Sequence, residues 1–142
     1  MILLQYASVM FATVFLAVLD PKEQTLRYAN AGHNPPIVRR APGTIESLDR
    51  TGPAIGLFDE LQLGEQTIRL GNGDAIVMYT DGVTEALNPR MEFYGTGRLI
   101  AATAAATRNA GEVLAHVEAD LNAFTEGAAQ SDDVAFLLLT KE

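Results

Sequence analysis

The first part of the chain alternates between short apolar runs and polar turn signals, a pattern typical of strands joined by tight turns. Asp20-Pro21-Lys22-Glu23-Gln24 joins the first two runs, and Ala41-Pro42-Gly43 joins the next two. Gly71-Asn72-Gly73-Asp74 separates the last two, and Asn-Gly favours a type I′ hairpin because both central residues of that turn need positive φ. Successive hairpins predict an antiparallel sheet. The expected strands are Phe11–Leu19, Thr25–Asn30, Pro36–Arg40, Thr44–Leu48, Glu65–Leu70 and Ala75–Tyr79.

Helical periodicity comes later in the chain. Arg98–Thr107 is rich in alanine, and Glu112–Phe124 places its large apolar residues on one stripe. Val134–Thr140 is then a continuous apolar run, which we interpret as a buried central strand. Strands first and helices afterwards predict an α+β layered fold, and no repeat or linker divides the chain. We therefore expect a single domain over residues 1–142.

The segment Met1–Leu19 carries no charge and is close to the length of a membrane span. Polar residues interrupt it, however, and no Lys or Arg precedes it, as an anchor or a secretory signal would require. Val9–Leu19 is rich in Val, Phe and Thr, which favours a buried strand. A membrane-anchored protein is the less favoured alternative.

Composition narrows the chemistry. The chain has 142 residues, no cysteine and a net charge of −8. The absence of cysteine excludes disulfides, thiolate zinc sites and thiol catalysis, and it agrees with a cytoplasmic location. The negative charge argues against nucleic acid or an anionic membrane as a partner. Only two histidines are present, His33 and His116, so we expect carboxylates to carry any chemistry.

Acidic residues stand beside two of the expected strands. Asp81 follows the run that ends at Tyr79 and precedes Gly82, which lets the backbone turn sharply or approach a ligand. Asp132 and Asp133 immediately precede the last apolar run. If those two strands are antiparallel neighbours, Asp81 meets Asp132. Converging carboxylates repel one another unless a cation lies between them, and Mg²⁺ or Mn²⁺ takes oxygen ligands of this kind.

A simpler interpretation of the same residues needs no ion. Asp81 would cap the short turn Val83–Leu87, and Ser131-Asp132-Asp133 would be a solvated turn. Because single Asp-Gly and Asp-Asp pairs are common, the residues taken alone leave both interpretations open.

Several motifs together resemble those of a known family. In chain order, they are Phe11-Ala12-Thr13-Val14-Phe15 through Asp20, Tyr28-Ala29-Asn30-Ala31-Gly32-His33-Asn34-Pro35-Pro36, Gly56-Leu57, Gly73-Asp74, Tyr79-Thr80-Asp81-Gly82-Val83-Thr84-Glu85-Ala86, Phe93-Tyr94-Gly95 and Gln130-Ser131-Asp132-Asp133-Val134. They resemble the PPM-type metal-dependent protein serine/threonine phosphatases, relatives of protein phosphatase 2C. The similarity is specifically to the bacterial branch of the sporulation stage II protein E type, and it covers nearly the whole chain.

This resemblance implies a sandwich of two antiparallel sheets flanked by helices, with a pair of Mg²⁺ or Mn²⁺ ions at one edge. It implies that Asp81 and Asp132 ligate the same ion, and that Asp133 orients them without ligating. Gly82 and Glu85 belong to the same motif as Asp81, and we expect them to support the site without ligating. Glu85 has no assigned role, and a plain exposed residue at a helix start is its alternative. The implied reaction is hydrolysis of phosphoserine or phosphothreonine on a regulatory phosphoprotein, such as an anti-sigma-factor antagonist.

The two histidines fit the site less well. A histidine can act as a general acid toward a leaving serine oxygen, which makes His33 a candidate. We favour the alternative that Asn30–Pro36 is a turn, since the sequence identifies no carboxylate partner for His33. We expect His116 to be solvated.

The chain also departs from the family pattern. The Gly-Gly-Asp motif, whose Asp bridges both metals in the family, does not occur before Phe11, and neither does a Ser-Gly-X-Gly segment. We therefore expect the chain to be the C-terminal portion of a longer phosphatase domain, whether as a fragment, a shortened relative or a half-domain completed by a partner. The isolated chain should bind at most one ion and hydrolyse little.

Missing sheet partners would leave open edges and an uncovered apolar face. We accordingly expect a homo-oligomer that forms through such a surface. The alternative function is a non-catalytic interaction or scaffold module that keeps the fold.

Overall fold

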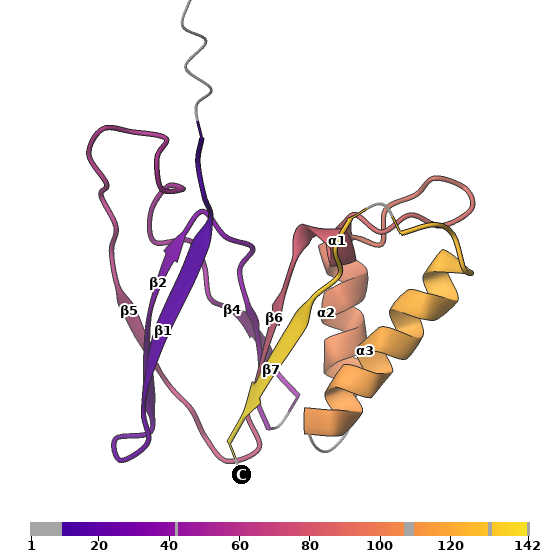
Figure 1. Ribbon diagram of the computed structural model, residues 1–142. Helices are drawn as coiled ribbons and strands as arrows, with labels where there is room; N and C mark the ends of the chain where they lie inside the picture. The colour runs from indigo at the N-terminus through magenta and orange to yellow at the C-terminus, as the bar shows by residue number, and fades with distance from the viewer. Residues whose placement is uncertain (1–9, 42, 107–109, 131, 142) are drawn as a thin grey trace, which may run out of the picture. The chain divides into compact units, whose positions relative to one another are not determined.

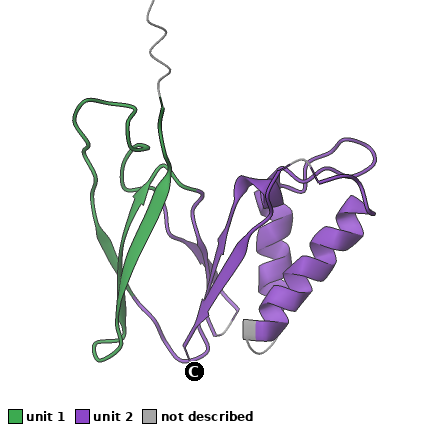
Figure 2. Cartoon of the chain, in the orientation of Figure 1, with its two compact units in different colours: residues 1–33, 50–68 green, residues 34–49, 69–142 purple. Residues whose placement is uncertain are grey.

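The computed structural model describes residues 10–41, 43–106, 110–130 and 132–141. The chain divides into two compact units, each built from two stretches of sequence (Figure 2). The first unit comprises Met1–His33 and Arg50–Ile68, and the second comprises Asn34–Asp49 and Arg69–Glu142. Figure 1 shows the helices and strands of each and labels all of them except β3.

The first unit is built on a three-stranded sheet in the order β1-β2-β5. Its strands are β1 (Val14–Asp20), β2 (Thr25–Ala31) and β5 (Gln66–Arg69). β1 and β2 pair antiparallel, from Val14 opposite Ala31 to Asp20 opposite Thr25. Their turn is closed by Asp20, whose Oδ1 accepts the backbone N–H groups of Lys22 and Glu23 at 2.9 and 3.0 Å. The predicted first hairpin is confirmed.

The prediction that the start of the chain is a buried strand is wrong for one face of β1. Phe15 stacks on the buried Tyr28 with ring centroids 5.5 Å apart. Val14, Leu16 and Val18 alternate with it and are 38%, 64% and 55% exposed. This second face of β1 is exposed, and an apolar run in the sequence does not show whether another layer covers the face that it forms.

The membrane-anchored alternative concerns the charge-free run Met1–Leu19. The first nine residues of the charge-free run lie outside the described residues. Within the described part of the chain, none of the helices has both the length and the apolar character to cross a bilayer.

The second unit combines a four-stranded sheet, in the order β4-β3-β6-β7, with three helices. All neighbouring strands in it are antiparallel. The strands are β3 (Ile37–Arg39), β4 (Ile45–Ser47), β6 (Ala75–Tyr79) and β7 (Phe136–Thr140), and the helices are α1 (Asp81–Thr84), α2 (Gly95–Ala105) and α3 (Ala110–Thr125). The α+β class and the hairpin between β3 and β4 are confirmed.

The two longer helices pack on this sheet. The register places Ile37, Val77 and Leu138 in one row across β3, β6 and β7, and these side chains meet the apolar stripes of α2 and α3. Tyr94, which precedes α2, is 2% exposed and donates a 2.6 Å hydrogen bond to Asp120 on α3. Burial and this bond raise the pKa of Tyr94. His116 on α3 is exposed, as expected.

Two predictions about strand neighbours are wrong. β5 and β6 belong to different sheets, so Gly71–Asp74 is not a hairpin turn. Only Gly73 in that segment has positive φ, whereas a type I′ turn needs positive φ at Asn72 as well. The last strand is also an edge strand in the described sheet rather than a central one, and Leu137 is 64% exposed. A continuous apolar run does not distinguish a central strand from an edge strand that packs on helices.

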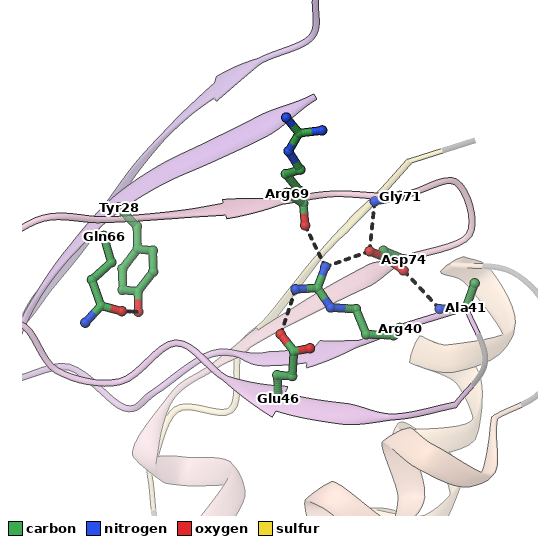
Figure 3. A network of polar contacts seen from close by, with 8 residues as sticks. All are labelled: Tyr28, Arg40, Ala41, Glu46, Gln66, Arg69, Gly71 and Asp74. Carbon is green, nitrogen blue, oxygen red and sulfur yellow. Dashed lines mark hydrogen bonds and ion pairs between the residues drawn. The ribbon is translucent and has the colours of Figure 1, made fainter. Parts of the chain in front are cut away.

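The segment Gly71–Asp74 is organised around the Asp74 carboxylate, which is 6% exposed (Figure 3). It accepts the backbone N–H groups of Gly71 and Ala41, both at 2.9 Å, and pairs with Arg40 at 2.8 Å. Arg40 also pairs with Glu46 at 2.6 Å. Burial alone favours the neutral carboxyl, but the hydrogen bonds outweigh it and hold the pKa of Asp74 below its ordinary value.

We expect Asp74→Asn to lower the free energy of unfolding by about 1.5–3 kcal/mol, the usual worth of hydrogen bonds to a charged group. Urea titrations at neutral pH measure the change. Asp49→Asn is the matched control, since Asp49 is exposed. Equal stability of the two variants would contradict the account.

The same comparison should depend on pH. Because the pKa of Asp74 is lower in the folded chain than in the unfolded chain, its contribution is complete above the ordinary aspartate pKa. It is lost as the pH falls through the lowered value. The stability difference between the original chain and Asp74→Asn should therefore shrink steadily in acid.

Candidate metal centre

Thr80 connects the end of β6 to the segment that leads into β7. Its backbone N–H donates to Ala135 O at 3.2 Å, and its hydroxyl accepts the N–H of Ala135 at 3.0 Å. The same hydroxyl donates to Asp133 O at 2.8 Å. These bonds continue the antiparallel β6–β7 pairing by one step beyond Tyr79 and Phe136. They hold the residue before Asp81 against the residue after Asp132.

Gly82 brings the two acidic segments into direct backbone contact. A Cβ atom at this position would lie 2.3 Å from Asp133 O and 3.3 Å from the carbonyl carbon of Asp132. Such distances are below van der Waals contact, so only glycine fits. The predicted convergence of the Asp81 and Asp132 segments, which assumed antiparallel neighbouring strands, is confirmed at the level of the backbone.

Asp81 is the first residue of α1, and its carboxylate is exposed. The N-cap of α1 is Thr80, with no capping bond from a side chain, so the alternative in which Asp81 caps the turn is wrong. Instead, the Asp81 carboxylate accepts a hydrogen bond at Oδ1 from the side-chain amide of Asn34.

The two later acids are also exposed. Asp132 Oδ1 accepts the backbone N–H of Asp133 at 2.7 Å, and its backbone carbonyl accepts Gln130 Nε2 at 2.6 Å. This local bonding agrees with the solvated-turn interpretation. It also turns the carboxylate of Asp132 toward the backbone of Asp133. Ser131 lies outside the described residues.

Glu85 is exposed, and its backbone N–H closes α1 by donating to Asp81 O at 2.8 Å. Among the described residues, the Glu85 side chain does not join a group that could hold a metal ion. Across the described ranges, no three His, Asp or Glu side chains gather closely enough to hold an ion. The donors at this edge are carboxylate oxygens, which is the chemistry that Mg²⁺ and Mn²⁺ prefer, but they supply only part of a coordination sphere. The residues present therefore fit one such ion incompletely.

His33 lies in a turn, as the favoured interpretation predicted. Its backbone N–H donates to Asn30 Oδ1 at 2.9 Å, and Gly32 has a positive φ of 71°. Its Nδ1 lies 3.2 Å from Thr13 Oγ1. The ring partner that the structure shows is therefore a neutral hydroxyl and not a carboxylate.

Sequence reasoning missed Asn34. The residue was part of a recognised motif, but its side chain received no role. Its partner Asp81 lies 47 positions away, and no spacing rule links the two. The available signal was the motif itself, Asn30–Pro36, which interrupts the strand pattern with an amide residue next to a histidine.

Comparison with solved structures shows the fold. The phosphatase domain of the cell fate determinant SpoIIE from Bacillus subtilis superposes with a TM-score of 0.70 at 17% identity, covering 92% of this chain and 56% of that one. The SiaA-PP2C domain of Pseudomonas aeruginosa gives 0.76 at 19% identity, covering 92% and 52%. The fold is therefore that of a PP2C-like domain of the PPM-type phosphatases.

Sequence comparison then places the chain within this class. The family model of stage II sporulation protein E (SpoIIE) matches residues 1–142, and the chain belongs to that family. Protein IcfG from Synechocystis sp. is 34% identical over 128 residues, which are 90% of this chain and 20% of that protein. Phosphoserine phosphatase RsbP from Bacillus subtilis is 31% identical over 75 residues, which are 53% and 19%. The chain thus spans about a fifth of the length of these curated relatives.

Gly82→Ala tests the backbone contact. The added methyl group would overlap Asp133 O, so we expect the free energy of unfolding to fall by about 1–3 kcal/mol, the usual cost of overpacking. Urea titration measures it. Gly97→Ala is the matched control, because a Cβ there meets nothing within 4 Å and lies in α2, where alanine is worth up to about 1 kcal/mol over glycine. Similar effects of the two substitutions would contradict the contact.

Proposed function

We propose that this chain is part of the catalytic domain of a metal-dependent protein serine/threonine phosphatase, with Asp81 and Asp132 holding one Mg²⁺ or Mn²⁺ ion. The observation that carries the proposal is the contact between the two acid-bearing segments, which Thr80 and Gly82 enforce. Membership of the SpoIIE family adds support, because carboxylates on two converging segments repel one another and a cation between them would relieve that repulsion.

The proposed substrate is a phosphoserine or phosphothreonine of a regulatory phosphoprotein, such as an anti-sigma-factor antagonist. Two relatives support this class, since RsbP and RsbU of Bacillus subtilis are both named phosphoserine phosphatases. We also propose a cytoplasmic location, with neither nucleic acid nor membrane as a partner. The net charge of −8 supports the last two points, because both surfaces are polyanionic.

A bound ion of this kind neutralises phosphate oxygens and activates a water for in-line attack. Other residues of the chain orient the two carboxylates that would hold this ion. Asn34 holds one oxygen of Asp81, and the backbone of Asp133 holds one oxygen of Asp132. Asp133 itself orients this segment through its carbonyl bond to Thr80. Two carboxylates are too few for the binuclear site of the family, so we propose that the isolated chain binds at most one ion and turns over phosphate esters poorly.

Calorimetric titration with Mn²⁺ tests the ligand assignment. Asp81→Asn and Asp132→Asn should each weaken binding at least as much as the roughly 10–100-fold typical for losing an outer partner of a metal ligand. Asp49→Asn should leave the affinity unchanged, because Asp49 is exposed and lies elsewhere in the sequence. Binding of Mn²⁺ that is indifferent to all three substitutions would exclude this site. Rapid hydrolysis of p-nitrophenyl phosphate by the chain would exclude the proposed weakness.

Asn34→Ala tests whether the amide positions Asp81. We expect Mn²⁺ affinity to fall by about tenfold, as is usual when the partner of a metal ligand is removed, with little change in stability. Asn34→Ser, which keeps a donor, should recover part of the affinity. Asn72→Ala is the control, since Asn72 is exposed in another turn. An unchanged affinity in Asn34→Ala would show that the contact has no part in binding.

We further propose that the chain associates with itself through the exposed face of β1. Leu16 and Val18 present apolar surface there, on an edge strand. Light scattering at micromolar concentration should give a mass above that of the monomer, and Leu16→Lys should lower it. A monomer in both cases would refute self-association.

The second candidate function is an interaction module that keeps the fold without catalysis. The absence of a three-acid cluster in the described residues favours it. The two functions separate on the Mn²⁺ titration, because a pure interaction module has no reason to bind the ion at Asp81 and Asp132.

A further inference from the structure

A cavity of about 430 Å³ opens beside the two acidic segments, within the second unit. Its walls come from the turn that follows Asp81, from the C-terminal end of α3 and from the loop that leads to Asp132. The residues that matter most for its position and chemistry are Gly82, Ala86, Leu121, Ala129, Gln130 and Val134.

The chain segments that line the cavity are the same segments that carry the acidic pair. Gly82 directly follows Asp81, and Val134 directly follows Asp133. Gln130 lies two residues before Asp132, whose carbonyl its side chain contacts at 2.6 Å. Because Gly82 and Val134 line the cavity, the opening adjoins the two segments that carry the acidic residues, and a peptide held at those residues would extend past it.

The lining is chemically distinct from its surroundings. None of the described residues that line the cavity is charged, and most are apolar or glycine. Its volume lies within the roughly 300–1,000 Å³ of ordinary ligand sites. The nearby carboxylates of Asp81, Asp132 and Asp133 disfavour an acidic occupant, and a lining that is mostly apolar or glycine favours an uncharged, apolar one. An apolar side chain is the occupant that both features fit.

We propose that this cavity receives the apolar side chains that flank the phosphorylated residue of a phosphoprotein substrate. The inference rests on the proposed function and adds the substrate class to it: phosphoserine or phosphothreonine next to aliphatic residues. The cavity contributes to affinity by removing those side chains from water, while the acidic pair and its ion select the phosphate.

The test uses short fluorescein-labelled peptides, measured by fluorescence anisotropy with the full chain and Mn²⁺. One peptide has phosphoserine flanked by leucine, a second has it flanked by glycine, and each has an unphosphorylated counterpart. We expect the leucine-flanked phosphopeptide to bind at least about tenfold more tightly than the glycine-flanked one, which is typical of an apolar group entering a pocket.

Filling the cavity should remove this preference. Ala129 lines the cavity and is exposed, so Ala129→Trp should reduce the affinity ratio of the two phosphopeptides toward one while leaving Mn²⁺ binding unchanged. Ala123→Trp is the matched control, because Ala123 is exposed on α3 and does not line the cavity. Asn122→Trp, at a second exposed lining position, provides an independent test if Ala129→Trp does not fold.

The possible failures are distinguishable. Binding that needs phosphate and Mn²⁺ but ignores the flanking residues would overturn the role of the cavity and leave the proposed function standing. Leucine-dependent binding that ignores phosphate and Mn²⁺ would overturn both the proposal and its link to the acidic pair. Absence of any peptide binding would do the same. A change of oligomeric mass in Ala129→Trp would identify the cavity as an interface between copies of the chain and overturn the proposal.

Discussion

The hydroxyl of Thr80, which bonds both Asp133 O and the N–H of Ala135, is the contact on which the candidate site depends. It lies at the end of the β6–β7 ladder. Its two hydrogen bonds therefore extend the register of the last strand and hold together the segments that leave the ladder beside Asp81 and Asp133. A backbone held in this way does not need its acidic side chains to be buried. The carboxylates of Asp81 and Asp132 are exposed. The backbone that carries them is nevertheless held in place, because the adjoining strands β6 and β7 are paired in a fixed register.

This arrangement brings two acid-bearing segments together at one end of the β6–β7 ladder. Gly82 allows the two segments to approach more closely than any other residue would. Asp74 is a contrasting case, because its buried carboxylate is paired with Arg40 and accepts two backbone N–H groups. The contrast is informative. In the second unit, the carboxylate of Asp74 is buried and paired with Arg40, whereas the carboxylates of Asp81 and Asp132 are exposed.

Much of this could be predicted from the sequence, because the determining features are local. Asp20 and the turn after it predicted the first hairpin, and the spacing of apolar residues predicted α3. The meeting of Asp81 and Asp132 followed from two apolar runs and one assumption about strand order. Motifs spread along the chain supplied the family, which comparison over residues 1–142 confirms.

The remaining features depend on contacts between distant residues. The Asn-Gly turn indicated a hairpin, but Asp74 draws Arg40 and Ala41 from a position more than thirty residues earlier, and β5 and β6 enter different sheets. The prediction that β1 is buried was wrong for one face, because apolar composition cannot show what covers a face of a strand. Asn34 was missed for the same reason, since its role exists only when the chain brings it to Asp81.

The central claim is that the ends of β6 and β7 form one ion site. Backbone amide spectra of the ¹⁵N-labelled chain, recorded during addition of paramagnetic Mn²⁺, test this most directly. The account predicts that the resonances of Gly82 and Asp133 broaden together at the lowest Mn²⁺ concentrations, before those of Asp49 or Asp74. Broadening that begins elsewhere, or that affects Gly82 and Asp133 at different concentrations, would contradict it.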